Sequence, residues 1–137
     1  MAALSSITAV RPTINTTFAS LPIYGATVAA GQPVYQDSTD SKWKLADSNA
    51  SATTAAAKGV AMTPGVADGY GIVATGGSIV LVGTTMTVGT TYNVGSTAGS
   101  IVPNADLTTG DYVTTLGTAS TATQLDLAIN ATGIVKP

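Results

Sequence analysis

Acid–base or metal chemistry in this 137-residue chain would fall to aspartate, because the sequence contains no histidine, cysteine or glutamate. Serine and threonine hydroxyls are plentiful, but a hydroxyl nucleophile needs a neighbouring base, and histidine is missing for that role. Asp37 and Asp40 are the closest pair of carboxylates, three residues apart in the polar segment 37–41. Aspartate is typical of turns because it accepts backbone hydrogen bonds there. We therefore predict a turn here, with no catalysis and no calcium site, since the further ligands and the glycine of a calcium loop are missing.

The other candidates for chemistry point the same way. Asp106 and Asp111 flank Gly110, which is again typical of a turn. The glycines at 69–71 and 76–77 do not match a phosphate-binding loop, because no helix is expected after them and no lysine is suitably placed. We therefore expect no catalytic residue, no bound metal and no cofactor, and the chain is not expected to be an enzyme. A hydrolase would have to work with aspartates such as Asp37 and Asp40 alone.

Trp43 is the single tryptophan and lies between Lys42 and Lys44. An exposed tryptophan ring with polar neighbours is a common platform for sugars, so a carbohydrate-binding surface is one interpretation. The alternation of polar and apolar residues over 42–45 instead predicts a half-buried strand with both lysines pointing outward. We favour this second interpretation, in which the ring belongs to the core.

The composition argues against several classes of function. A net charge of −2 without a basic stripe predicts no binding to nucleic acid. The sequence has no long apolar run, and residues 1–10 lack the charged and apolar regions of a secretory signal, so no membrane association is expected. Apolar residues make up 45% of the chain, which argues against general disorder. Most of them are small, so we expect a modest core that gains burial by association with other subunits.

The elements that would position these residues are short strands. From Leu21 onward, apolar runs alternate with glycine, proline and polar turns, typical of an all-β domain. We predict a small antiparallel β-barrel or β-sandwich over residues 21–137. Strands are expected at 24–30, 34–36, 42–45, 59–62, 71–75, 78–82, 85–88, 91–94, 100–103, 112–116 and 124–129. The single helical candidate is the Ala/Ser/Thr-rich segment 46–57, which is either one short helix or a loop with a helical turn, with Asp47 or Ser48 as its cap.

Glycines mark most of the expected turns. An apolar residue, a glycine and then a tyrosine recur around three of them, where glycine permits a positive φ and the tyrosine opens the next strand with its ring inward. A glycine pair between two apolar runs, at 76–77, predicts a β-hairpin. The predicted turn glycines are Gly31, Gly76, Gly77, Gly89 and Gly110, and the predicted core aromatics are Tyr35, Trp43, Tyr92 and Tyr112.

Residues 1–20 differ from the rest of the chain. Pro12 disfavours a helix or a central strand, and the threonine-rich context favours extended chain, so we predict an N-terminal arm. A disordered terminus and a helix, suggested by the spacing of the apolar residues, are the alternatives. Ordering such an arm must be offset by burial of its apolar side chains elsewhere. We therefore predict contacts with a neighbouring subunit or a larger surface through Leu4, Ile7, Val10, Ile14 and Phe18.

Four sequence segments, in their order and spacing across about residues 24–135, resemble segments of the capsid cement or head decoration proteins of tailed phages. They are Ala30-Gly-Gln-Pro-Val-Tyr35 followed by Lys44-Leu-Ala46; Lys58-Gly-Val-Ala-Met62; Thr87-Val-Gly-Thr-Thr-Tyr-Asn-Val94 leading to Ala98-Gly-Ser-Ile101; and Leu116-Gly-Thr-Ala119 followed by Leu125-Asp-Leu127. The resemblance rests on the four segments in this order, and no single segment is specific to the family. Residues 1–20 lie outside it, and the chain carries fewer charges than is usual for the family.

The resemblance implies a small all-β structural protein that is made in the host cytoplasm and binds the outer capsid surface of a virion. It implies the major capsid protein as partner, and several copies, as homotrimers or dimers, that bridge neighbouring capsid subunits and stabilise the expanded shell. Threonine-rich strands of low charge suit such contacts, including the pairing of exposed strand edges. The alternative is a carbohydrate-binding or fibre module on the virion surface, built around Trp43.

Overall fold

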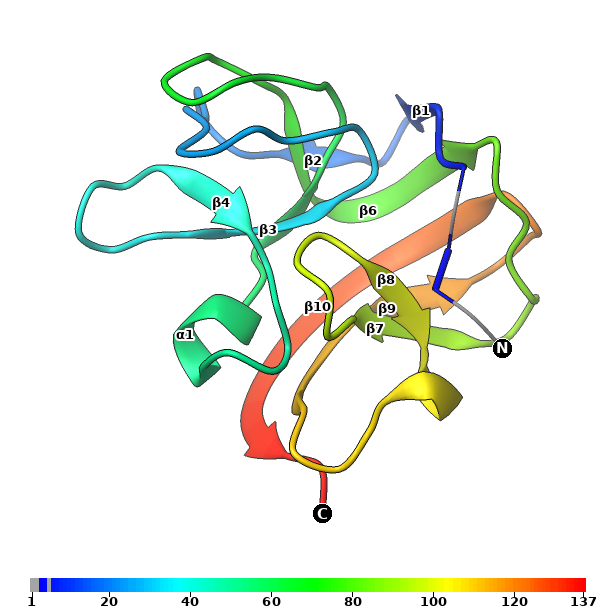
Figure 1. Cartoon of the computed structure of the whole chain (residues 1–137). Coiled ribbons are helices and arrows are strands. Elements are labelled where there is room, and N and C mark those ends of the chain that lie inside the picture. Colours follow the sequence, from blue (N-terminus) through cyan, green and yellow to red (C-terminus); the bar gives the residue numbers. More distant parts are fainter. Residues whose placement is uncertain (1–2, 5) are drawn as a thin grey trace.

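The computed structural model describes residues 3–4 and 6–137, which form a curled antiparallel β-sheet shaped as a half-barrel (Figure 1). Residues 1, 2 and 5 of the predicted arm lie outside the described residues. The predicted all-β class is confirmed. The described residues contain ten strands, one short α-helix and one 3₁₀ turn: β1 Ala9–Pro12, β2 Thr17–Phe18, β3 Pro33–Gln36, β4 Trp43–Leu45, α1 Ala52–Ala55, β5 Gly59–Ala61, β6 Val73–Val82, β7 Thr91–Val94, β8 Ile101–Pro103, η1 Asn104–Asp106, β9 Tyr112–Ala119 and β10 Gln124–Val135.

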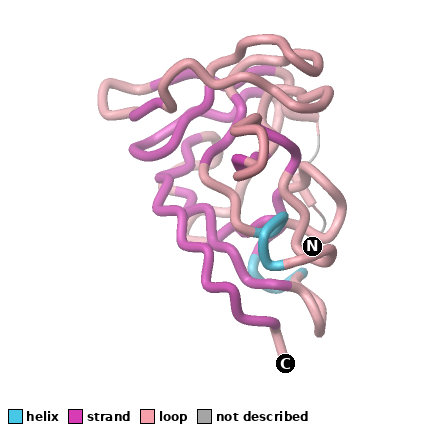
Figure 2. The backbone as a smooth tube through the Cα atoms, turned by 90° about the vertical axis from the view of Figure 1, so that its left-hand side faces the viewer, coloured by secondary structure: helices cyan, strands magenta, loops and turns pink. Residues whose placement is uncertain are grey.

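β6 is the strand on which the sheet is organised. β1 and β10 pair with its C-terminal half, and β2 and β5 pair with its N-terminal half. The sheet then branches, from β5 through β3 to β4 and from β10 through β9 and β7 to β8. Several long loops lie together at the end of the molecule opposite the C-terminus, as Figures 1 and 2 show. We call this end of the molecule the loop end.

Two clusters of buried side chains fill the curl. The larger cluster joins β6, β7, β9 and β10 through residues such as Leu81, Leu116 and Leu125, none of which is exposed. The smaller cluster consists of Tyr24, Val28, Val34, Trp43, Ala61 and Val73. Because full burial of one large aliphatic side chain contributes about 1.5–3 kcal/mol, these clusters provide the main stabilisation of the half-barrel.

Most predicted strands are present, and they end at the predicted turns. Strands occur within or overlapping 34–36, 42–45, 59–62, 91–94, 100–103, 112–116 and 124–129. Segment 24–30 is instead a loop with isolated bridges at Tyr24 and Val28, and 85–88 is a loop that leads into the turn at Gly89. Gly31, Gly89 and Gly110 have φ values of +88°, +83° and +97°, as their turns require.

Of the two alternatives for 46–57, the structure shows the loop with a helical turn, α1, and its cap is neither Asp47 nor Ser48. Ser51 is the cap: its Oγ accepts from the backbone N of Thr54 at 3.1 Å, and the Thr54 Oγ1 accepts from the backbone N of Ser51 at 3.1 Å. Asp47 instead accepts from the backbone N of Asn49 at 3.1 Å and shapes the preceding turn. The reciprocal pair at 51 and 54 satisfies two backbone donors, which fixes the start of the helix there.

The hairpin predicted at Gly76-Gly77 is wrong, because β6 runs through both glycines. Gly77 has a φ of +72°, and a Cβ on it would lie 1.9 Å from the backbone oxygen of Asn15. These glycines therefore allow the turn between β1 and β2 to cross β6 at close range. A contact between segments distant in the sequence, and not a local turn, explains the glycine pair.

The N-terminal segment is extended, but its described part lies along β6 of the same chain. β1 and β2 both pair antiparallel with β6. Between them, the hydroxyls of Thr13 and Thr16 donate to the backbone oxygen of Ser78 at 3.0 Å and 2.5 Å. The segment is thus part of the same sheet as the rest of the domain.

The side chains predicted to make contacts from this arm divide into two groups. Val10 is buried with 8% exposure, and Leu4 and Ile7 pack against the larger core cluster of their own chain. Ile14 and Phe18 remain exposed. Val10 is therefore not available for an outside contact, whereas the prediction stays open for the partly buried Leu4 and Ile7 and for the exposed Ile14 and Phe18.

Candidate functional site

An aspartate–lysine cluster lies on the hairpin between β3 and β4, where a turn is predicted. Asp37 Oδ1 accepts from the backbone N of Thr39 at 2.9 Å, and Asp40 Oδ1 accepts from the backbone N of Lys42 at 3.0 Å. Lys44 Nζ lies 2.7 Å from Asp37 Oδ2 and 3.2 Å from Asp40 Oδ2. Both carboxylates shape the turn as predicted, and one lysine bridges them.

These contacts favour the charged forms of the groups in the cluster. The hydrogen bond from Lys44 lowers the pKa of Asp37, and the hydrogen bond from the backbone N of Lys42 lowers the pKa of Asp40. The pKa of Lys44 is raised by its bond to Asp37, and the pKa of Lys42 is raised by Asp68, 2.5 Å away. A general base needs a pKa near the working pH, so carboxylates held in this way are poor proton acceptors.

Asp111, beside Gly110, has a similar role in a second turn. Its carboxylate is buried, and Oδ2 accepts from the backbone N of Thr108 at 2.9 Å and from the Thr108 hydroxyl at 3.0 Å. Lys136 Nζ donates to the backbone oxygen of Leu107 in the same turn, which fastens the end of β10. Across residues 3–4 and 6–137, no three acidic side chains gather in a way that could hold a metal ion.

Two of the four predicted core aromatics lie in the core. Trp43 is 6% exposed and Tyr92 is 1% exposed, whereas Tyr35 and Tyr112 are only half-buried. Successive side chains of a strand point to opposite faces, and Val34 takes the inward position next to Tyr35. Tyr112 begins β9 beside the exposed end of β10. The prediction of an inward ring is therefore wrong for these two tyrosines.

Tyr24 is the core aromatic that the sequence analysis missed. Its side chain is fully buried, its hydroxyl donates to the backbone oxygen of Thr63 at 2.7 Å, and burial raises the pKa of the phenol. Gly65 and Gly71 pack directly on the ring, since a Cβ on either would lie within 2.5 Å of a ring atom. The ring holds loop 63–72 against the sheet. The glycines repeated along that loop were the available signal, because they indicate close packing on a large side chain.

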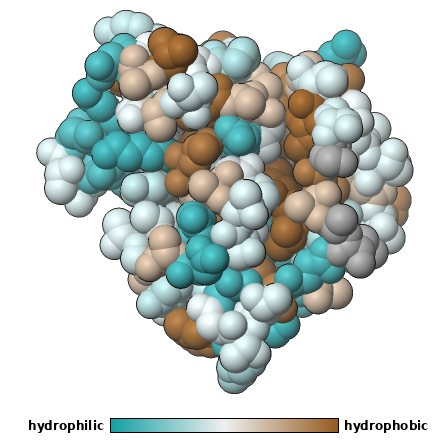
Figure 3. Space-filling view, viewed as in Figure 1, coloured by the Kyte–Doolittle hydropathy of each residue, from teal (hydrophilic) through white to brown (hydrophobic). Residues whose placement is uncertain are grey.

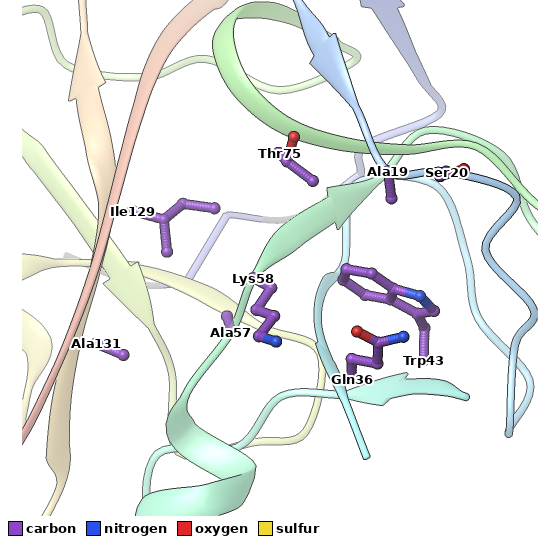
Figure 4. Close-up of a pocket in the computed structure, with 9 residues that line it drawn as sticks. All are labelled: Ala19, Ser20, Gln36, Trp43, Ala57, Lys58, Thr75, Ile129 and Ala131. Carbon is purple, nitrogen blue, oxygen red and sulfur yellow. The ribbon is translucent and has the colours of Figure 1, made fainter. Parts of the chain in front are cut away.

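A cleft of about 600 Å³ separates the two branches of the sheet (Figure 4). Gln36, Trp43 and Lys58 lie on one side of it, and Ile129 and Ala131 of β10 lie on the other. The remaining lining residues are Ala19, Ser20, Ala57 and Thr75. Trp43 forms a wall of this cleft, but its side chain is largely buried. A sugar-binding platform would need a more exposed indole ring.

Apolar side chains reach the surface at the loop end of the molecule, as Figure 3 shows. We define the apolar end as Phe18, Leu21, Pro22 and Ile72, which line a groove of about 350 Å³ together with Ala19 and Gly71. Leu21 is 81% exposed, and Phe18 and Ile72 are exposed by about half. Leu21 also has a φ of +45°, which is an unfavourable backbone conformation for leucine. Of the predicted contact residues of the arm, Phe18 belongs to this groove.

Comparison with known proteins yields no relative: no protein-family model matches the chain, and no curated protein sequence is significantly similar to it. Within the described residues, the helices are too short to cross a membrane.

Proposed function

We propose that this chain is a structural protein that binds the outer surface of a tailed-phage capsid and stabilises it by bridging major capsid proteins. Several copies, as trimers or dimers, would occupy each virion. The four sequence segments over residues 24–135 support the choice of partner, because they resemble segments of cement proteins. The structural observation that carries the proposal is the apolar end, because its exposed apolar side chains line one groove.

An apolar groove at the tip of a small domain favours association with a protein surface. Exposed apolar side chains that gather in one place are more typical of binding surfaces than apolar residues scattered singly. Complete burial of a side chain such as Leu21, now 81% exposed, contributes up to about 1.5–3 kcal/mol. Strained backbone is found most often at functional sites, and the positive φ of Leu21 is such a strain. Both features support the groove as the contact with the capsid.

The proposal is tested by co-sedimentation of the purified protein with expanded, undecorated heads of tailed phages. Full-length protein is compared with Leu21→Asp and Ile72→Asp. Aspartate tolerates the left-handed backbone better than leucine does, so Leu21→Asp is expected to fold normally. The matched control is Val88→Asp, which places the same charge on another exposed side chain, 62% exposed, in the turn before β7.

We expect saturable binding by the unaltered protein and by Val88→Asp, and at least tenfold weaker binding by each variant of the apolar end. Absence of binding by the unaltered protein rejects the capsid as partner. Equal binding by Leu21→Asp, Ile72→Asp and the control would retain the capsid but reject the apolar end as the contact.

A further inference from the structure

The cleft exists because two strands separate along β6. β10 pairs with β6 from Val80 to Gly77, and its last partner there is Leu127. β5 pairs with β6 only at Ala74 and Val73. Between these two pairings β10 and β5 diverge, and Thr75 of β6 lies at the point of the resulting wedge. The cleft is therefore bordered by β10, whose edge towards β6 has no described partner strand beyond Leu127.

One edge of β10, the edge that pairs with β6 up to Leu127, is without a partner strand beyond that residue in the part of the chain that the structure describes. Among the described residues, β9 alone pairs with β10 beyond Leu127, through Asn130, Ala131 and Val135. Residues 128–135 contain no charge and no proline, and nearly all are exposed. Proteins usually protect a free strand edge with charge or proline, because an unpaired row of backbone donors and acceptors readily pairs with another chain. Over residues 128–135, this edge of β10 has neither a charged residue nor a proline.

The walls of the cleft suit an extended polypeptide. Ala19, Ala57 and Ala131 have small side chains, which allow another backbone to approach closely. Ile129 offers apolar contact on one side, and the largely buried Trp43 closes the other side. These features match the two requirements of strand addition, namely a free backbone edge and shallow pockets for alternate side chains.

Charge favours one kind of occupant. Lys58 lines the cleft, is exposed, and forms no ion pair with any described residue, whereas Lys42 and Lys44 are paired with aspartates. An acidic side chain beside Lys58 would supply the missing partner. A sugar is disfavoured, because the Trp43 ring is only 6% exposed and cannot stack on it as an open face.

We propose that the cleft binds an extended segment of a partner polypeptide, which adds as a strand to the free edge of β10 and places a carboxylate beside Lys58. This site adjoins the apolar end at Ala19, which lines both. It is a second binding site, and it does not depend on the partner being a capsid protein.

The test uses the fluorescence of Trp43, the single tryptophan of the chain and a wall of the cleft. The probes are heptapeptides of alternating valine and threonine, blocked at both ends, with one aspartate at each position in turn. A matched set carries lysine in place of aspartate. We expect a saturable change of the emission for at least one aspartate peptide at concentrations up to about 1 mM, and at least tenfold weaker binding of its lysine counterpart.

Two further comparisons separate strand addition from other binding. Lys58→Glu is expected to weaken binding of the best aspartate peptide about tenfold, whereas Arg11→Glu, the same charge change on an exposed cation of β1, is expected to leave it unchanged. N-methylation of alternate peptide nitrogens removes donors without altering the protein. One of the two alternate sets is expected to abolish binding, because only one set faces β10.

The proposal is overturned if no aspartate peptide binds in this range, or if Lys58→Glu and Arg11→Glu have equal effects. It is also overturned if both N-methylated forms bind as well as the parent peptide. None of these results bears on the co-sedimentation assay, whose variants lie at the apolar end, so failure of one proposal is distinguishable from failure of the other.

Discussion

Replacement of Gly77 by alanine tests how tightly the N-terminal segment is built into the sheet. Gly77 has a φ of +72°, and a Cβ there would lie 1.9 Å from the backbone oxygen and 2.6 Å from the backbone carbon of Asn15. Both atoms belong to the main chain, so no side-chain rotation relieves the clash. The turn between β1 and β2 must move away from β6.

The expected cost follows from two contributions. A positive φ costs a residue other than glycine about 1–2 kcal/mol. Displacement of the turn also weakens the bonds from Thr13 and Thr16 to the Ser78 oxygen and from the Ser78 backbone N to Asn15 Oδ1, each worth about 1 kcal/mol. We therefore expect Gly77→Ala to lower the free energy of unfolding by about 3–5 kcal/mol.

Gly89→Ala is the matched control for this change. Gly89 has a φ of +83°, but a Cβ on it would meet no atom within 4 Å. Only the backbone contribution remains, so we expect a loss of about 1–2 kcal/mol. Urea unfolding followed by circular dichroism measures both variants, and hydrogen exchange at the amides of 9–11 reports displacement of β1. Equal losses for the two variants, with unchanged exchange at β1, would refute the packing of the segment against β6.

Three further predictions concern the supports of the loops. Tyr24→Phe leaves the Thr63 carbonyl without its buried donor and should lower the free energy of unfolding by about 1–3 kcal/mol in urea titrations; no loss would contradict this bond. Asp37→Asn should destabilise the protein at pH 7, because the pKa of Asp37 is lowered in the fold by Lys44. This difference from the unaltered protein should shrink as the pH falls below about 4, where the carboxylate becomes protonated, and a constant difference down to pH 2 would contradict the ion pair. Ser51→Ala removes the cap of α1 and should cost about 0.5–2 kcal/mol, measured by thermal unfolding against the exposed control Ser38→Ala.

Local chemistry explains which parts of the fold the sequence predicts well. The turns at Gly31, Gly89 and Gly110 are predicted because each needs a positive φ that glycine alone adopts easily. The role of Asp37 is predicted because an aspartate two residues before a backbone N–H accepts from it within one turn. These features depend on neighbours in the sequence, so the sequence is sufficient to find them.

Long-range packing explains what the sequence analysis missed. Gly76-Gly77 has the pattern of a hairpin, but its glycines serve a crossing by residues more than sixty positions away. Tyr24 lies in a segment without a regular strand, so alternation gives no sign of its burial. The cleft arises from the divergence of β10 and β5, which no local pattern records. Lys58 becomes a candidate only when this geometry brings it opposite Ile129.

The capsid-cement proposal is tested most directly by the temperature at which expanded phage heads lose their integrity. Heads are heated without added protein, with saturating unaltered protein, and with saturating Leu21→Asp, while light scattering or release of packaged DNA is followed. The proposal predicts that the unaltered protein raises this temperature and that Leu21→Asp raises it less or not at all. Heads that bind the unaltered protein but fail at the same temperature as bare heads would contradict a stabilising role.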